Sequence, residues 1–212
     1  MPVLVAETFL SLQGEGVWAG WPCFFIRLSG CNLRCLYCDT RYAYLDGAQR
    51  DIPSLVAEWS ASRARFIQIT GGEPLLQRQA IPLMDALLRA GAHVLLETNG
   101  SLPLALVPRG VVKVVDRKTP GSGMEGSWLE ENLRYINEKD QMKFVITGRN
   151  DYLWAADIVK SGFLFRYTEV IFSPAWGVCD PADLASWILD DRLPVRFQIQ
   201  LHKILWGEKR GK

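Results

Sequence analysis

The sequence carries almost no excess charge. Its 24 Lys and Arg residues balance 23 Asp and Glu residues, so the formal net charge is +1 across 212 residues. Proteins that bind nucleic acid or a membrane surface usually present a strong field of one sign. We therefore expect no nucleic-acid partner, and we expect the partner to be a small molecule of little charge.

Long apolar runs are also missing. Charges such as Arg27, Arg89 and Lys113 interrupt every apolar stretch before it reaches the roughly 18 residues of a membrane span. The start of the chain carries Glu7 and has no basic segment ahead of an apolar one, unlike a secretory signal. The sequence thus predicts a protein that has no membrane partner and works in the cytoplasm.

Internal repeats, low-complexity segments and linkers are absent as well. Apolar residues make up 49% of the chain and charged residues 22%, which is typical of a folded globular protein. A chain of this length can bury a full hydrophobic core. We therefore expect residues 1–212 to form a single domain.

Short β-branched or aromatic runs alternate with segments of helical period. The expected strands are 3–9, 23–28, 66–70, 93–97, 111–115, 142–147, 169–172 and 195–201. The expected helices are 53–63, 78–90, 127–138, 150–161 and 180–191. Because strands alternate with helices, the sequence predicts an α/β fold with a parallel sheet.

Most of the unusual polar residues follow directly after an expected strand. They are Cys31, Gly71, Gly72, Glu73, Glu97, Thr98, Asn99, Asp116, Lys118, Ser173 and His202, the last of which ends the final expected strand. The carboxyl ends of parallel strands meet at one edge, where α/β folds build their active sites. We expect a site there, although loops are polar in any protein and the pattern alone leaves that interpretation open.

Three of the five cysteines lie within eight residues. Cys31, Cys35 and Cys38 form a C-x3-C-x2-C run, and no fourth Cys or His lies nearby in the sequence. A loop of this length can wrap three thiolates around one face of an iron–sulfur cubane and leave the fourth iron open. This crowding suits one metal centre and a reducing compartment better than it suits paired disulfides.

The cysteine run resembles the signature of the radical S-adenosylmethionine (radical SAM) superfamily. The turn Gly71-Gly72-Glu73-Pro74, after a strand and before a helix, is similar to the superfamily element that receives the amino group of the cofactor. The resemblance implies that the three cysteines hold a 4Fe-4S cluster whose open iron binds S-adenosylmethionine. It also implies that residues 1–212 form one radical SAM domain.

The two ends of the chain extend the resemblance to the 7-carboxy-7-deazaguanine synthases. The segments that carry it are 11–16 (SLQGEG), 38–40 (CDT), 97–100 (ETNG), 116–120 (DRKTP) and 198–206 (QIQLHKILW). It implies a trimmed, incomplete TIM-like βα barrel and the ring contraction of 6-carboxy-5,6,7,8-tetrahydropterin to 7-carboxy-7-deazaguanine with loss of ammonia, a step toward 7-deazapurines such as queuosine. It also implies Mg²⁺, a homodimer and an electron donor such as flavodoxin or ferredoxin. The short cysteine loop has no inserted helix, which some family members carry.

The same resemblance implies roles for individual residues. The substrate contacts are Leu12, Gln13, Gly14, Glu15, Gly16, Arg27 and His202; the contacts to S-adenosylmethionine are Gly71, Gly72, Glu73, Glu97, Asn99, Lys118 and Ser173. The Arg27 guanidinium suits the pterin carboxylate, since its planar fork can bind two oxygens. Thr40 is expected to hold Mg²⁺ beside that carboxylate.

Each of these roles has a plainer alternative. Arg27 on an edge strand would be a solvated charge, His202 would be a satisfied core histidine, and Thr40 would close the turn after the cysteine loop. Two other functions share some of the motifs. A glycyl-radical activating enzyme needs the cysteine loop and the Gly-Gly-Glu-Pro turn, and a zinc-binding module would recruit Cys23, Cys179, His93 or His202.

Overall fold

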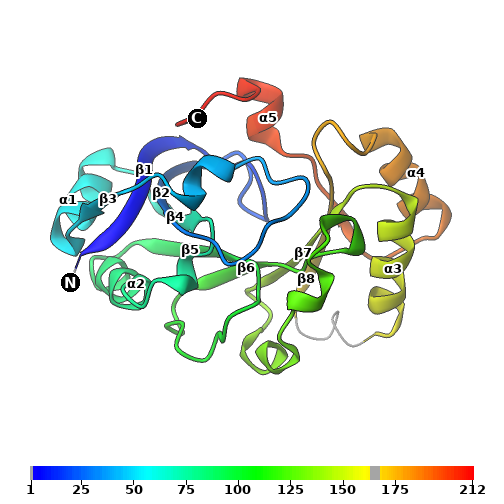
Figure 1. The fold of residues 1–212 in the computed structure, drawn as a ribbon, viewed down its shortest axis with the longest axis horizontal. Coiled ribbons are helices and arrows are strands. Elements are labelled where there is room, and N and C mark those ends of the chain that lie inside the picture. Colours follow the sequence, from blue (N-terminus) through cyan, green and yellow to red (C-terminus); the bar gives the residue numbers. More distant parts are fainter. Residues whose placement is uncertain (1, 163–167) are drawn as a thin grey trace.

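The computed structural model describes residues 2–162 and 168–212, and its nine strands in these ranges form one sheet (Figure 1). The sheet order is β3-β1-β2-β4-β5-β6-β7-β8-β9. The strands are β1 (Val3–Leu12), β2 (Pro22–Leu28), β3 (Ala48–Arg50), β4 (Phe66–Gly71), β5 (His93–Thr98), β6 (Val112–Asp116), β7 (Gln141–Ile146), β8 (Glu169–Pro174) and β9 (Arg196–Phe197).

All neighbouring pairs from β2 to β9 are parallel, whereas β1 runs antiparallel to both β2 and β3. A short loop can join antiparallel strands, but parallel strands need a crossover. The crossover helices are α1 (Ile52–Ser62), α2 (Ala80–Arg89), α3 (Arg149–Lys160) and α4 (Pro181–Asp190). Since β3 and β9 end the sheet without pairing to each other, the fold is an incomplete βα barrel, as expected.

Local sequence explains where the crossover helices begin. Asp51 caps α1 by accepting a hydrogen bond of 2.9 Å from the Ser54 N–H, and Asp180 caps α4 in the same way through the Ala182 N–H at 2.8 Å. Pro53 and Pro181 stand in the first turns, where the missing N–H costs nothing. These signals confirm the helices expected at 53–63 and 180–191.

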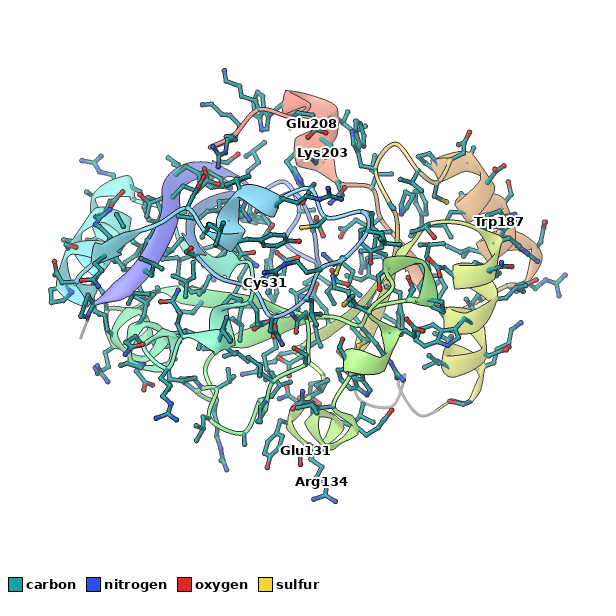
Figure 2. The ribbon with its side chains drawn as sticks, viewed as in Figure 1. Cys31, Glu131, Arg134, Trp187, Lys203 and Glu208 are labelled. Atoms are coloured by element: carbon teal, nitrogen blue, oxygen red, sulfur yellow. The ribbon has the colours of Figure 1, made fainter. Side chains whose placement is uncertain are left out.

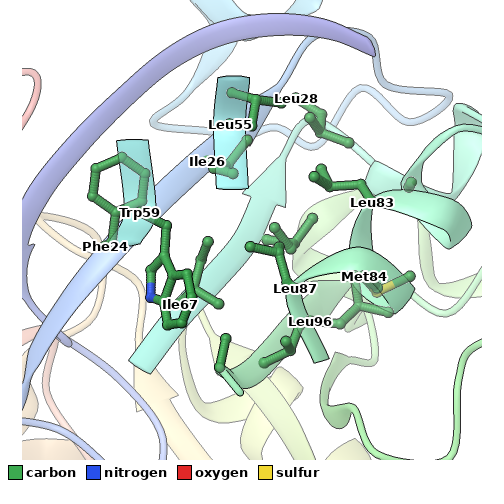
Figure 3. Packing of buried hydrophobic residues seen from close by; sticks show 14 of the residues in the cluster. Phe24, Ile26, Leu28, Leu55, Trp59, Ile67, Leu83, Met84, Leu87 and Leu96 are labelled. Carbon is green, nitrogen blue, oxygen red and sulfur yellow. The ribbon is translucent and has the colours of Figure 1, made fainter. Parts of the chain in front are cut away.

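The helices bury one face of the sheet in two apolar clusters. In the first, α1 and α2 pack on β2, β4 and β5, with Ile26, Leu55 and Leu83 fully buried (Figure 3). In the second, α3 and α4 pack on β7 and β8 around Phe144 and Phe172. Burial at roughly 25 cal/mol per Å² of apolar surface makes these clusters the main source of stability, and they hold the carboxyl edge of the sheet rigid.

The expected helix at 127–138 is wrong. Residues Glu125–Ser127 and Glu130–Tyr135 are 3₁₀ turns instead. The buried Asn132 amide donates to the carbonyls of Gly100 and Leu102 at 2.9 and 3.0 Å, and its oxygen accepts from the Leu104 N–H at 2.9 Å. These side-chain bonds fix the segment against the loop after β5 in place of a continuous helix.

The expected strand at 195–201 is also wrong beyond its first residues. Only Arg196–Phe197 pairs with β8, and Leu201–Trp206 forms the short helix α5, so His202 is helical. The Leu201 N–H donates to the Gly14 carbonyl at 3.0 Å, which turns the chain away from the sheet and onto the β1–β2 loop. Neither α5 nor the three-residue β3 has a sequence signal of its own.

No helix within residues 2–162 or 168–212 has the length and apolar character needed to cross a membrane.

Candidate active site

A cavity of about 420 Å³ lies at the carboxyl ends of the parallel strands, as the placement of polar residues predicts. The candidate residues that line it are Leu12, Gln13, Gly14, Glu15, Arg27, Cys31, Cys35, Cys38, Thr40, Gly71, Gly72, Glu97, Asn99, Lys118 and His202. Gly16, Glu73 and Ser173 do not line it. The fold therefore brings together residues from both ends of the chain and from four strand ends.

The three clustered cysteines line the cavity and are partly exposed. Burial raises the pKa of the Cys31 and Cys35 thiols, and the Lys118 ammonium opposes that rise. Cys23 is buried at the start of β2 and pairs across to Phe66, far along the strand from the cysteine loop. His93 pairs with the same end of β4. Two of the residues that a zinc site would recruit thus lie at the opposite edge of the sheet.

No three His, Cys, Asp or Glu side chains in the described ranges converge on a point as ligands of a single metal ion do. All three cysteines of the loop nevertheless line the same cavity, which is compatible with a polynuclear cluster that three thiolates share. Two buried polar atoms at this cavity, Tyr37 Oη and Asp116 Oδ1, have no hydrogen-bond partner within the described part of the chain. Buried polar atoms are rarely left unpaired, so these atoms fit a polar cofactor in the cavity.

Glycine at positions 71 and 72 brings β4 against the cysteine loop. Gly71 has φ +147°, and a Cβ on it would lie 2.1 Å from the Leu28 carbonyl oxygen. A Cβ on Gly72 would lie 2.1 Å from the Gly30 carbonyl oxygen and 2.7 Å from Cys31 Cβ. Only glycine permits this approach, which leaves backbone rather than side chain facing the cavity.

The Gly72→Ala variant is therefore expected to lose about 1–3 kcal/mol of unfolding free energy, because backbone atoms must shift to admit the methyl group. Urea denaturation measures the change. Gly126→Ala is the matched control, since a Cβ there has no atom within 4 Å. Equal stability of the two variants would show that the close packing of β4 on the cysteine loop is not required.

Glu73 and Asn99 hold the cavity wall together. The Glu73 carboxylate is fully buried and accepts hydrogen bonds from the Leu75 N–H, the Thr98 hydroxyl and the Asn99 N–H at 3.0, 2.9 and 2.7 Å. Burial raises its pKa, and these donors oppose the rise. The Asn99 amide donates to Asn32 Oδ1 at 3.3 Å, which ties β5 to the cysteine loop. Ser173 is buried on β8.

The Arg27 guanidinium lines the cavity with its side chain 17% exposed. Its Nε donates to Glu7 at 2.8 Å, and the Tyr42 hydroxyl donates to the same carboxylate oxygen at 2.6 Å. Burial disfavours its charge, but Tyr42 and Glu7 outweigh burial and hold the Arg27 pKa above its usual range. Arg27 is thus a cation fixed by Glu7 at the cavity wall, and it is not a solvated surface charge.

Residues near the two termini close one side of the cavity together. Gln13 donates to Gln68 at 2.9 Å, and Gln200 donates to Glu15 at 2.8 Å. The Gln198 amide donates to the Gly16 carbonyl at 2.8 Å and also accepts from the Gly16 N–H. His202 packs against Gly14, where an added Cβ would overlap its ring. His202 is therefore half-buried at the cavity and is not a core histidine.

Thr40 follows the cysteine loop and donates its hydroxyl proton to Asp39 Oδ1 at 2.7 Å. The other Asp39 oxygen lies 3.2 Å from Lys203 Nζ on α5, and Lys203 also pairs with Glu208 (Figure 2). Lys203 holds the pKa of Asp39 below its usual range, although burial alone would raise it. The C-terminal helix is thus tied to the segment that carries Thr40.

Sequence reasoning missed Lys143, whose side chain is 3% exposed at the centre of the cavity wall. Its ammonium lies 2.7 Å from Glu97 Oε1 and 3.6 Å from Asp116 Oδ2, and it also donates to Glu15. Lys118 forms a second ion pair with Asp116 at 3.0 Å. The sequence did contain one signal for Lys143, because it is the only charged residue of the expected strand 142–147. A strand that is buried on both faces tolerates a charge only where that charge is paired.

Comparisons with known proteins agree with this geometry. Residues 25–115 match the Radical SAM superfamily. The chain is 42% identical to the 7-carboxy-7-deazaguanine synthase of Koribacter versatilis, over 95% of this chain and 96% of that protein. It is 41% identical to the 7-carboxy-7-deazaguanine synthase of Chlorobaculum tepidum, over 99% and 97%.

Among solved structures, the crystal structure of QueE from Escherichia coli aligns with a TM-score of 0.77 over 95% of each chain, at 24% identity. That likeness independently supports the incomplete-barrel fold. Taken together with the near full-length identity to curated relatives, it shows that this chain belongs to the 7-carboxy-7-deazaguanine synthase family of radical SAM enzymes.

Proposed function

We propose that this cavity is where the chain converts 6-carboxy-5,6,7,8-tetrahydropterin to 7-carboxy-7-deazaguanine with loss of ammonia. One observation carries the proposal. The cysteine loop, the Gly71–Gly72 turn and residues near both termini line the same cavity of about 420 Å³, which is within the range of small-molecule sites. A cluster, a cofactor and a bicyclic substrate must meet in one place for this reaction.

Cys31, Cys35 and Cys38 would hold the 4Fe-4S cluster. When bound, the cluster supplies the one-electron reduction of S-adenosylmethionine that starts the radical chemistry. The residues that we assign to S-adenosylmethionine are Gly71, Gly72, Glu73, Glu97, Asn99, Lys118 and Ser173. Among them, Glu73 and Ser173 act from behind the wall of the cavity, because they are buried and do not line it.

The substrate would lie between Arg27 and the loop 12–16. Arg27 offers its outer guanidinium nitrogens to the pterin carboxylate, while Glu7 holds Nε and so fixes the plane of the fork. Gln13, Glu15 and His202 face the aminopyrimidinone edge, and Leu12, Gly14 and Gly16 contribute backbone groups. Gly16 acts indirectly, since Gln198 binds both of its peptide groups.

Thr40 would bind Mg²⁺ beside the substrate carboxylate. Thr40 lines the cavity, and donation of its hydroxyl proton to Asp39 leaves the oxygen lone pairs free to bind a cation. Mg²⁺ there would neutralise the carboxylate and hold the substrate in one conformation.

The Thr40→Val variant is expected to need a Mg²⁺ concentration at least about tenfold higher for half-maximal stimulation, because the shape is kept and one ligand oxygen is lost. A Mg²⁺ titration of the initial rate measures this. Thr8→Val is the control, since the Thr8 hydroxyl donates to Glu58 outside the cavity. An unchanged half-saturating concentration in Thr40→Val would rule out Thr40 as a ligand.

Three further points belong to the same proposal. A flavodoxin or a ferredoxin would supply the electron that reduces the cluster before the first turnover; because the overall reaction is redox-neutral, no net electron is consumed in each turnover. The reaction would take place in the cytoplasm, where thiols stay reduced.

The chain would act as a homodimer, and the exposed apolar side chains of Trp176, Ile204 and Trp206 offer a surface for the second copy. Light scattering of the purified protein tests the last point.

The experiment that tests the proposed function is anaerobic incubation of the reconstituted, reduced enzyme with S-adenosylmethionine and the pterin. We expect 7-carboxy-7-deazaguanine and ammonia by mass spectrometry and ammonia assay, with no partner protein needed. Cleavage of S-adenosylmethionine with the pterin untouched would point to another reaction of the superfamily, such as glycyl-radical activation. A colourless protein with one zinc per chain would contradict the whole assignment.

A further inference from the structure

Lys143 is the most deeply buried cation at the candidate site among the described residues. It lies on β7, 3% exposed, and contacts carboxylates from three other elements: Glu15 in the β1–β2 loop, Glu97 on β5 and Asp116 on β6. A buried ammonium is costly unless it is paired and hydrogen-bonded. These contacts compensate the cost, but they do not by themselves explain why the sheet carries a charge at this point.

A second buried lysine shows what a purely structural pair looks like in this fold. Lys113 on β6 lies 2.8 Å from Asp140, and Asp140 also accepts hydrogen bonds from the backbone N–H groups of Lys113 and Asn137. That pair does not line the cavity and fixes backbone segments. Lys143 differs because its carboxylate partners Glu15, Glu97 and Asp116 all line the cavity.

Glu15 and Glu97, two partners of Lys143 that line the cavity, have unused hydrogen-bond acceptor capacity. Glu15 receives Lys143 on Oε2 and Gln200 on Oε1, which leaves further lone pairs on both oxygens. Its side chain is 16% exposed, and residues 12–15 line the cavity. Glu97 receives Lys143 and the Thr70 hydroxyl, the latter at 2.9 Å. Each carboxylate is therefore fixed by two side-chain donors, lines the cavity and has lone pairs left to accept a further donor.

The charges around Lys143 favour a ligand that donates hydrogen bonds. Glu15, Glu97 and Asp116 contribute three negative charges against the two positive charges of Lys143 and Lys118, and Arg27 acts on Glu97 from further away. Burial would raise the pKa of Glu97, but Lys143 outweighs it and keeps that pKa well below its usual range. Glu97 thus stays ionised at neutral pH and can act as a hydrogen-bond acceptor.

We propose that Lys143 is a positioning residue for the substrate: by holding Glu15 as a fixed carboxylate, it lets Glu15 accept the N–H donors of the aminopyrimidinone edge. The inference rests on the proposed function, since it needs the pterin in this cavity. It assigns to β7 a part in substrate recognition that acts only through Glu15. Loss of the ammonium would remove the Glu15 ion pair and leave Glu15 near the Glu97 and Asp116 carboxylates, which keep only their contacts to Thr70 and Lys118.

The test is a double-mutant cycle on the reconstituted enzyme, with the pterin dissociation constant measured by equilibrium dialysis in the absence of reductant. Lys143→Met is expected to raise the dissociation constant of 6-carboxytetrahydropterin at least about tenfold. In a protein that already carries Glu15→Gln, Lys143→Met is expected to raise the pterin dissociation constant by no more than about twofold, because its effect passes through Glu15. Lys143→Gln repeats the cycle if Lys143→Met does not fold.

Lys113→Met is the matched control, since it removes a buried ammonium outside the cavity. Its folded fraction is expected to bind the pterin within about twofold of the unmodified protein. If the two substitutions reduce pterin affinity additively, or if Lys143→Met leaves the affinity unchanged, the role of Lys143 is overturned while the proposed function stands. If the unmodified protein binds S-adenosylmethionine but not the pterin, the proposed function fails first, and the inference fails with it.

Discussion

The Cys35→Ala variant is expected to contain no intact 4Fe-4S cluster and to have no detectable turnover. Cys35 lies at the centre of the loop, with its thiol at the cavity beside Lys118. With only two thiolates left, the loop would leave two irons without a protein ligand, and neither Cys23 nor Cys179 lines this cavity to replace the lost thiolate. Anaerobic iron and sulfide analysis, together with the brown colour of the protein, measures the loss.

The other two cysteines serve as controls. Cys23 is buried on β2, and burial raises the pKa of its thiol to about 12, so it is a small core residue. Cys179 immediately precedes Asp180, the N-cap of α4, and does not line the cavity of the candidate site. Cys23→Ala and Cys179→Ala should therefore keep the full cluster content. A complete cluster in Cys35→Ala, or loss of the cluster in Cys179→Ala, would contradict the ligand assignment.

The Arg27→Met variant is expected to lower kcat/KM for the pterin by about ten- to a hundred-and-fiftyfold, because a charge-assisted pair with the carboxylate is worth roughly 1.5–3 kcal/mol. The loss should appear mainly in KM, since the carboxylate is bound before and after the rearrangement. Initial rates at saturating S-adenosylmethionine measure it. A pterin that lacks the carboxylate should bind the variant and the unmodified protein equally.

Arg50→Met is the matched control for Arg27. Arg50 on β3 pairs with Glu58 at 2.7 Å, as Arg27 pairs with Glu7, but Arg50 does not line the cavity. Half-exposed pairs of this kind contribute only about 0–1 kcal/mol, so activity should be unchanged. If Arg27→Met weakens binding of the pterin without a carboxylate as strongly as that of the substrate, Arg27 does not recognise the carboxylate.

The strand pattern could be predicted from the sequence because buried parallel strands are nearly continuous apolar runs. The segments around Ile69, Leu96 and Phe144 have this character, and turn residues mark their carboxyl ends. The segments that were predicted wrongly depend on distant partners. Asn132 replaces a helix with side-chain bonds to the loop after β5, and Leu201 begins a helix because Gly14 accepts its N–H.

Much of the candidate site could also be predicted, for a related reason. The cysteine run in one loop and the two glycines at a strand end are local sequence patterns. The spacing of these residues along the chain is enough to indicate what they do. Lys143 has no such pattern, since its role depends on carboxylates that are 128, 46 and 27 residues away in sequence. The fold brings these groups together, so only the coordinates reveal which lysine inside a strand is paired and which cavity it faces.

One cavity is expected to hold S-adenosylmethionine and the pterin together throughout the reaction. The ratio of 7-carboxy-7-deazaguanine formed to S-adenosylmethionine consumed tests it most directly. If the hydrogen taken from the substrate is returned within the closed cavity, the cofactor is regenerated, and product should exceed consumed cofactor many times over. A ratio that never rises above one, or cofactor consumption without this product, would contradict the claim.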